Sequence, residues 1–434
     1  MQRVQKTFTI NSVENFKSKL LIWSQQFEAI SWLDSNQYNQ KYSSFDAVLA
    51  VDEFTSIKTD YTNAFEKLKE YQSITNDYLF GYLSYDLKND VENLSSKNFD
   101  GLDFADLYFF QPQRIIFIKG NEVHFSYLKM IDDEIDDDFN NIKNLVDEIN
   151  SEPTDHDLKI KLRIHKDEYY QKVNSVLNHI NRGDIYEANF CQEFYAENAT
   201  INPLVAYHHL NKISEPPFAT FLKCNYQYLL SASPERYIKK EGTKIVSQPI
   251  KGTAKRLISK VDDEQIAFDL ARDEKERSEN IMIVDLVRND LSKTAIKGSV
   301  KVEELCEVYS FKQVHQLIST VVSEVSETTN PVDIIRDSFP MGSMTGAPKL
   351  SAMKIIEEEE ETKRGLYSGA VGYFSPTGDF DFNVVIRSIL YNEEKNYVSF
   401  SVGGAITAKS TPEKEYEECL LKAKAMKYVL TNKD

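Results

Sequence analysis

Short runs of aromatic and β-branched residues recur along the C-terminal half of the chain, and they constrain the fold more than any other feature. Such residues favour β-strands. Strands are predicted at or near 183–194, 218–222, 227–231, 369–374, 382–390 and 397–402. Helical patterns are fewer and do not alternate regularly with the strands; they lie at 166–182, 263–288, 349–361 and 412–430. The sequence therefore favours layered α+β architecture over a regular βαβ array.

The first 150 residues carry the same mixture of patterns but no cluster that points to chemistry. Strands are predicted at 46–51, 78–85 and 114–119, and a helix at 61–71. We expect the acidic run 132–138 to be a solvated loop and the run Glu357 to Glu361 to be a solvated helix face. Ser151-Glu152-Pro153 marks a boundary between an N-terminal subregion, 1–150, and a catalytic region, 160–434.

Charge and composition exclude several classes of protein. The net charge of −17 over 434 residues argues against a nucleic-acid partner, which requires a basic surface. An acidic protein that binds an anion must gather local positive charge or a metal ion. The sequence contains neither an apolar signal core nor a run of about 18 apolar residues, so we expect no membrane segment and a cytoplasmic protein. The four cysteines have no metal-site spacing and are expected to be reduced packing residues: Cys191, Cys224, Cys306 and Cys419.

Lys251 stands in a turn-like segment, Gln248-Pro249-Ile250-Lys251-Gly252-Thr253. An ammonium group partly removed from water gives up its proton more readily, and the neutral amine is a nucleophile. The alternative is an ordinary solvated lysine. Glu235, in Ser233-Pro234-Glu235, is a candidate acid for the same site, although a glutamate after a proline is usually a turn residue. His315 is a third candidate, whose alternative is a hydrogen-bonded core histidine.

Two pairs of glutamates have helical spacing. Glu276 and Glu279 are three residues apart, as are Glu415 and Glu418, so each pair shares one helix face. Either pair alone is typical of a solvated surface. Brought together, they would form an oxygen-only site with the chemistry that Mg²⁺ prefers.

Two further segments suggest anion binding. The loop 342–349 places Ser343, Thr345 and Gly346 just before a helix, where backbone N–H groups can approach an anion, although a tight turn explains the same pattern. Arg387 lies among apolar strand residues, where it needs an anionic partner, either a ligand carboxylate or an internal acid. The tandem Gly403-Gly404 would let a ligand approach the backbone closely.

Together and in this order, these segments resemble the chorismate-utilising enzymes. The matching elements are Gly183-Asp184-Ile185-Tyr186, Ser233-Pro234-Glu235, Pro249-Ile250-Lys251-Gly252-Thr253, 275–290, Gly346-Ala347-Pro348-Lys349, and Gly403-Gly404 with 415–418. The resemblance covers about residues 165–430. It implies the fold of anthranilate synthase component I, a layered sandwich of two mainly antiparallel β-sheets flanked by helices.

Within that family the resemblance is greatest to component I of aminodeoxychorismate synthase, because anthranilate synthases usually carry alanine in place of Lys251. The resemblance implies that this lysine attacks C2 of chorismate and expels the C4 hydroxyl. Ammonia then adds at C4 and expels the lysine, which gives 4-amino-4-deoxychorismate for 4-aminobenzoate and folate synthesis. Covalent catalysis of this kind divides one difficult substitution into two easier steps.

The resemblance also implies roles for the other candidates. Glu235 would be the general acid/base and His315 would lie close to the ring. Glu279 and Glu418 would bind Mg²⁺ directly, with Glu276 and Glu415 nearby or bound through water. Substrate-binding groups would be Ser343, Thr345, Gly346 and Lys422 at the ring carboxylate, and Tyr367, Arg387, Gly403 and Gly404 at the enolpyruvyl carboxylate.

Two positions qualify the resemblance. Glu187 stands where ammonia-using members usually have glutamine and water-using members a lysine base, so an isochorismate or salicylate synthase is not expected. The stretch from Ile30 to Ser35 resembles a region that binds tryptophan in relatives, although a buried Trp32 is the simpler account.

The source of ammonia must lie outside this sequence. No cysteine stands in a Gly-x-Cys-x-Gly motif, so the resemblance implies a separate glutamine amidotransferase subunit and a separate lyase. Anthranilate synthase component I is the alternative within the family. A non-catalytic homologue is the alternative from another class, and it would be expected to lack some of the glutamates, Arg387 or Lys251.

Overall fold

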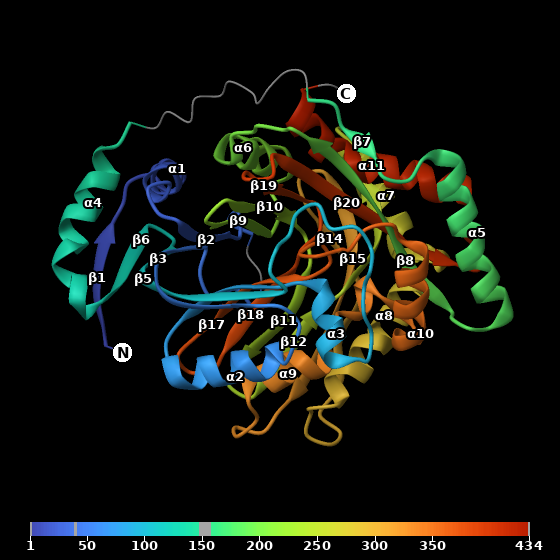
Figure 1. The fold of residues 1–434 in the computed structure, drawn as a ribbon, viewed down its shortest axis with the longest axis horizontal. Helices are drawn as coiled ribbons and strands as arrows, with labels where there is room; N and C mark the ends of the chain where they lie inside the picture. Colours follow the sequence, from blue (N-terminus) through green and yellow to red (C-terminus); the bar gives the residue numbers. More distant parts are fainter. Residues whose placement is uncertain (1, 39–40, 147–157, 433–434) are drawn as a thin grey trace.

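The computed structural model describes residues 2–38, 41–146 and 158–432, whose strands form two antiparallel sheets. The sheets are joined at β3 (Ala47–Thr59) and β5 (Leu107–Lys119), which pair with each other along most of their length (Figure 1). β5 also pairs with β6 (Glu122–Leu128), which carries β1 (Arg3–Thr9) at its outer edge. All pairs of named strands are antiparallel. The predicted sandwich of mainly antiparallel sheets is confirmed.

The first sheet continues from β3 toward the C-terminal strands. Its hydrogen-bonded order is β2 (Ala29–Asp34), β9 (Phe218–Cys224), β10 (Gln227–Ser233), β19 (Ser388–Asn392), β20 (Tyr397–Thr407) and β8 (Glu187–Glu197). Two short strands, β7 (Lys161–Leu162) and β16 (Gly346–Ala347), pair with the free edge of β8.

The second sheet continues from β5. Its order is β4 (Leu79–Leu83), β17 (Ala370–Phe374), β18 (Phe380–Val384), β11 (Arg236–Glu241), β12 (Lys244–Gln248) and β15 (Val314–Glu324). β15 also pairs with β13 (Ile250–Lys255) and β14 (Lys301–Ser310). Strands from both halves of the sequence are thus neighbours: β2 pairs with β9, and β4 with β17.

Side chains that alternate between the two faces of each strand pack the two sheets against each other and each sheet against helices, which gives a helix–sheet–sheet–helix sandwich. Leu222 and Leu390 point into the core between the sheets, while their neighbours Phe221 and Tyr391 point to the helical side of the first sheet. This period of two is what a strand buried on both faces requires. Helices on the first sheet include α5 (Lys166–Arg182), α6 (Pro203–Ser214), α10 (Lys349–Glu359) and α11 (Pro412–Thr431). On the second sheet lie α2 (Ala64–Thr75), α8 (Glu274–Ser292) and α9 (Pro331–Ser338).

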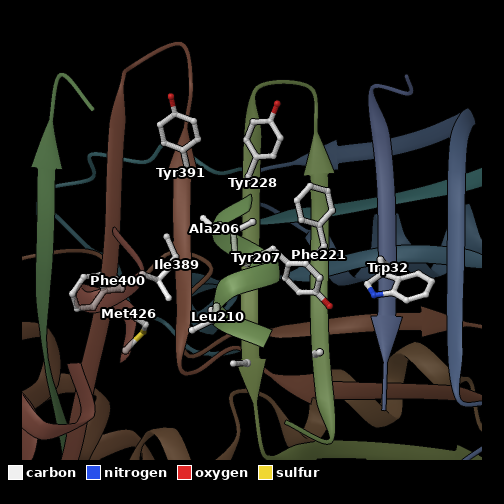
Figure 2. Close-up of a cluster of buried hydrophobic side chains, with 14 of the residues drawn as sticks. Trp32, Ala206, Tyr207, Leu210, Phe221, Tyr228, Ile389, Tyr391, Phe400 and Met426 are labelled. Atoms are coloured by element: carbon white, nitrogen blue, oxygen red, sulfur yellow. The ribbon is translucent and has the colours of Figure 1, made fainter. Parts of the chain in front are cut away.

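Figure 2 shows how α6 covers the first sheet, with Tyr207 and Leu210 directed toward β9, β10 and β19. Trp32 of β2 belongs to the same layer and is completely buried. Trp32 is therefore a core residue, as the alternative to tryptophan binding predicted. Ser35, just after β2, lines a pocket together with Phe218 and Arg236, and tryptophan binding there stays a prediction.

Two predicted elements are wrong because a local feature divides them. The helix expected over 263–288 is two helices, α7 (Lys260–Arg272) and α8, because the Asp273 side chain accepts hydrogen bonds from the N–H groups of Lys275 and Glu276 and caps a new helix. The strand expected over 382–390 is β18 and β19, separated at Arg387, whose φ of +53° is incompatible with a continuous strand.

Two acidic runs differ from their predictions, the first in its backbone conformation and the second in the burial of one residue. Residues 132–138 are helical, a 3₁₀ turn followed by α4 (Ile135–Asn144), and acidic residues are stabilising in a first helical turn. In the run Glu357 to Glu361, Glu360 is buried and forms an ion pair with Arg364 at 2.7 Å. The predicted boundary at 151–153 lies outside the described residues.

The remaining helices are α1 (Val13–Ser24), which packs with α4, and the single turn α3 (Lys88–Val91). α5 ends at Gly183 in the left-handed conformation, as the glycine stop predicts. In the part of the chain that the structure describes, no helix is long and apolar enough to cross a membrane.

Candidate active site

A bulge in β13 presents Lys251. Pairing of β13 with β15 shifts register between Ile250 and Thr253, so Lys251 and Gly252 are left outside the ladder. Gly252 has a φ of +94°, which favours glycine, and a Cβ there would lie 3.2 Å from Glu276 Oε2. Asn280 of α8 donates to the carbonyl of Lys251 at 3.2 Å and pins the bulge.

Three carboxylates, from different parts of the chain, lie close enough to the Lys251 ammonium to be influenced by its charge. Its charge stabilises the ionised forms of Glu235, between β10 and β11, of Glu187, at the start of β8, and of Glu418, on α11. Within the described residues, the Lys251 side chain makes neither a hydrogen bond nor an ion pair. The amine is therefore held near acidic groups without being locked to one of them.

Glu235 is a buried acid whose pKa lies near neutral pH. It lies in the two-residue gap between β10 and β11 and is only 4% exposed. Burial raises its pKa to about 7, although a hydrogen bond from Ser343 and the charge of Lys251 act in the opposite direction. An acid with such a pKa can both donate and accept a proton near neutral pH.

The loop 342–348 brings one of its small residues to this acid. Ser343 is the member that faces Glu235, whereas the Thr345 hydroxyl donates to the carbonyls of Met341 and Gly342. Gly346 tolerates no side chain, because a Cβ there would lie 2.2 Å from the Glu187 carbonyl oxygen. Of the three predicted loop ligands, Ser343 is thus near the acid, while Thr345 and Gly346 shape the loop backbone.

Arg387 has a charge that the protein does not neutralise by a direct ion pair. It occupies the break between β18 and β19 and is partly buried, and within the described residues no carboxylate lies within ion-pair distance. Burial lowers its pKa, against the opposing effects of Tyr367 and Glu418. The internal ion pair considered as an alternative is therefore not formed. Tyr367 is buried beside it and accepts a weak hydrogen bond from Cys191 Sγ at 3.7 Å.

The two tandem glycines of β20 face opposite sides of the first sheet. A Cβ on Gly404 would lie 3.3 Å from Glu415 Oε2, so this residue borders the acidic face of α11. A Cβ on Gly403 would lie 2.3 Å from Cys191 Sγ, on the opposite side. Lys422 joins the strand to the helix, since it donates to the Gly403 carbonyl at 2.8 Å and pairs with Glu418 at 2.7 Å.

The two glutamate pairs, one on α8 and one on α11, all act electrostatically on one lysine, Lys275. Burial lowers the pKa of Lys275, but Glu279, Glu276, Glu415 and Glu418 together raise it above its ordinary value. The pKa of Glu276 is raised mainly by burial and also by neighbouring carboxylates. The pKa of Glu415 is raised as well, again mainly by burial. Burial raises the pKa of Glu418, but the opposing effect of Lys422 is larger, so that the pKa is below its ordinary value.

This oxygen-only donor set is chemically suited to Mg²⁺. However, in residues 2–38, 41–146 and 158–432 no three acidic, histidine or cysteine side chains are arranged closely enough to hold a metal ion. Two of the carboxylates instead form ion pairs with lysines: Lys275 is 3.7 Å from Glu279, and Lys422 is 2.7 Å from Glu418. A divalent ion would have to replace these ammonium groups.

Both ring nitrogens of His315 have protein partners. Nε2 is 3.0 Å from Asp263 Oδ1 and Nδ1 is 2.8 Å from Ser310 Oγ, and the ring is buried. This geometry matches the core histidine that was the alternative interpretation. A contact with the substrate ring stays a prediction. The four cysteines are free and buried, as expected.

Two residues that organise the site, Asn280 and Lys275, are not among the residues predicted from the sequence. Asn280 fixes the Lys251 bulge, and Lys275 is the common counter-ion of the four glutamates. Asn280 stands four residues after Glu276, which places it on the same helix face, and that spacing was the available signal.

A buried acid of raised pKa beside a lysine that forms no ion pair within the described residues is typical of enzyme active sites. The family described as chorismate binding enzyme matches residues 23–428, which is nearly the whole chain. The chain therefore belongs to this family.

Relatives within the family carry two different names. The chain is 40% identical over 265 residues to aminodeoxychorismate synthase component 1 of Salmonella typhimurium, covering 61% of this chain and 58% of that protein. It is 35% identical over 349 residues to an anthranilate synthase component I-like protein of Synechocystis, covering 80% and 71% of the two chains. The chain thus spans less than two thirds of the aminodeoxychorismate relative.

A solved structure has the same fold. The crystal structure of anthranilate synthase component I from Streptococcus pneumoniae has a TM-score of 0.77 and 24% identity, covering 90% of this chain and 94% of that one. This likeness concerns the fold alone.

Proposed function

We propose that the chain is a component I aminodeoxychorismate synthase, which uses chorismate and ammonia to form 4-amino-4-deoxychorismate. The observation that carries the proposal is Lys251, an amine that forms no ion pair with the residues that the structure describes and that is presented on a bulge beside Glu235. Identity of about 40% to proteins of that name supports it.

The positions of Lys251, Glu235 and Arg387 suggest a reaction in two steps, in which the lysine attacks first and ammonia then displaces it. Lys251 forms a C–N bond at C2 of the ring while Glu235 donates the proton with which the C4 hydroxyl leaves as water. Ammonia then forms a bond at C4, and the electron pair of the Lys251 C–N bond returns to the lysine. Arg387 binds a substrate carboxylate, since a guanidinium without an internal partner gains a bidentate pair there.

The proposal includes a Mg²⁺ ion bound by the two glutamate pairs. Glu279 and Glu418 would hold it, with Glu276 and Glu415 beside them or bound through water. Its chemistry would be that of a hard cation that neutralises the ring carboxylate in an acidic protein. The proposal includes a separate glutamine amidotransferase subunit as the ammonia source, because none of the four buried cysteines stands in a glutaminase motif.

Anthranilate synthase component I is the second candidate, because the relative of similar name aligns with more of this chain. The two activities are distinguished by their products. Anthranilate is fluorescent and forms with release of pyruvate, whereas aminodeoxychorismate keeps the enolpyruvyl group. The purified chain should therefore be incubated with chorismate, an ammonium salt and Mg²⁺, and the products identified by mass. Unconsumed chorismate with an intact fold would refute both candidates.

The lysine itself is tested by replacement. We expect Lys251→Ala to lower ammonia-dependent formation of aminodeoxychorismate by roughly 10²-fold or more, because covalent catalysis is lost. The matched control is Lys255→Ala, at the exposed end of the same strand. Undiminished product formation by a folded Lys251→Ala protein would rule out the covalent mechanism.

A further inference from the structure

Lys349 is a largely buried lysine without a role in the proposed reaction. It begins α10, directly after the loop 342–348, and its side chain is 15% exposed. Its ammonium group pairs with Asp290 at 2.6 Å and donates to the carbonyl oxygens of Ser338 at 3.1 Å and Pro340 at 2.9 Å. An ammonium group has three N–H donors, so each of them has a partner.

These contacts tie together the residues on either side of the loop and join both to α8, which carries the aspartate. Ser338 is the last residue of α9 and Lys349 the first of α10, so one ammonium group spans the entry and the exit of the loop. Further along, Arg364 holds the loop by donating to the Met344 carbonyl at 2.6 Å. Ser343 lies between these two anchors in the chain.

The ion pair between Lys349 and Asp290 is a poor source of stability. Asp290 is 5% exposed; burial raises its pKa and lowers the pKa of Lys349, although each charge acts in the opposite direction on the other. The other charges that act on the pair are Lys293, 3.5 Å from Asp290, and Glu92. Because both pKa shifts favour the uncharged forms, desolvation outweighs the attraction. The geometry that the pair fixes is therefore the better explanation for it.

The part of the loop that the pair holds lies next to Glu235. This acid accepts a hydrogen bond from Ser343, which lowers its pKa. Glu235 and Asp290 line the same cavity of about 20 Å³, together with Gly342 and Ser343. A cavity of this size has room for about one water molecule, so packing alone does not hold the loop against the acid.

We infer that Lys349 and Asp290 are positioning residues, a clamp that holds Ser343 against the general acid Glu235. The inference rests on the proposed function, in which Glu235 is the acid. Without the clamp, Glu235 would lose its hydrogen bond from Ser343, and the pKa of the acid would rise, because that bond favours the ionised form. The acid would also be held less firmly, which slows a proton transfer that depends on geometry.

The test replaces both charges together, as Asp290→Leu/Lys349→Met, so that neither charge is left buried without the other. Replacement of a buried ion pair by apolar residues of similar volume is often neutral or stabilising, so the variant should melt close to the wild type. We expect its kcat for ammonia-dependent formation of aminodeoxychorismate to fall roughly 10-fold or more. The KM for chorismate should change by less than about 3-fold.

A pH profile distinguishes positioning from general damage. As pH rises, kcat/KM falls where Glu235 loses its proton, and in the double variant this alkaline limb should move to higher pH. Ser343→Ala removes the same hydrogen bond and should move the limb in the same direction. In the Ser343→Ala background the clamp substitutions should add no further shift, because both changes act through one bond. The charged group that acts on Glu235, Lys251, is present in every variant.

Lys172→Met is the matched control. Lys172 pairs with Glu361 at 2.7 Å, beyond the opposite end of α10 from the loop, and its side chain is 14% exposed. The substitution thus breaks an ion pair of a lysine as buried as Lys349 and leaves the loop contacts in place. Its kcat and its alkaline limb should be those of the wild type.

Each result decides. With an active wild type, a folded double variant whose alkaline limb does not move overturns the inference and leaves the proposed function intact. A further shift in the Ser343→Ala background, or an equal loss of kcat in Lys172→Met, overturns it too. If the double variant does not fold, Asp290→Asn weakens the pair and keeps the side-chain shape, and an unmoved limb there overturns the inference. A wild type that forms no aminated product with ammonium refutes the proposed function, and the inference with it.

Discussion

Replacing Glu235 by glutamine should stabilise the protein at high pH while it removes activity. The pKa of this buried carboxyl is raised from its ordinary value of 4.5 to about 7. A difference of this size between folded and unfolded chains corresponds to about 3 kcal/mol. Between these pKa values the folded protein holds a proton that the unfolded chain has lost, so stability falls as pH rises from 4.5 to about 7.

Glutamine has no proton to lose, so the variant lacks this pH dependence. Below pH 4.5 the contribution from residue 235 should be similar in both proteins, and above pH 7 the variant should be more stable by up to about 3 kcal/mol. An unfolding entropy of about 0.9 kcal/mol/K for 434 residues converts this into about 3 °C. Turnover should fall by roughly 10²-fold or more, because glutamine cannot act as the acid.

The assay is calorimetric melting of both proteins from about pH 5 to about pH 9, with chorismate consumption measured on the same samples. Glu417→Gln, at an exposed position on α11, is the control for changes in net charge. A melting difference that is the same at every pH would refute the assignment of the raised pKa. Undiminished turnover would refute the role of Glu235 as the acid.

Three further predictions test the loop, the anion site and the metal site. Gly346→Ala should cost about 3 kcal/mol of stability, because its Cβ would lie 2.2 Å from a backbone oxygen; a melting temperature equal to the wild type would contradict that packing. Arg387→Lys should raise the KM for chorismate by roughly 10-fold or more through loss of a bidentate pair, whereas an unchanged KM would remove Arg387 from the binding site. Glu418→Gln should weaken Mg²⁺ binding measured by calorimetry by about 10-fold or more, with Glu417→Gln unaffected; equal affinities in both would place the ion elsewhere.

Much of the architecture could be predicted because local patterns match the elements. Strand propensity and glycine punctuation placed β9, β10 and β17 to within two residues, and the start of β20 at the right residue, since each strand is long enough to bury alternate side chains on two faces. Errors arose where one residue acts against the pattern. Asp273 begins a new helix, and Arg387 breaks a strand by its left-handed backbone.

The sequence by itself determined which groups are available: a lysine beside a glycine, two pairs of glutamates at helical spacing, and an arginine among apolar residues. It also identified the family, because the motifs occur in one order. What only the tertiary structure decided is how these groups act on one another. The bulge at Lys251 depends on how β13 pairs with β15, and the raised pKa of Glu235 depends on burial, which arises when strands distant in the chain meet. Propensity and spacing are local properties, whereas desolvation is a property of the packed fold.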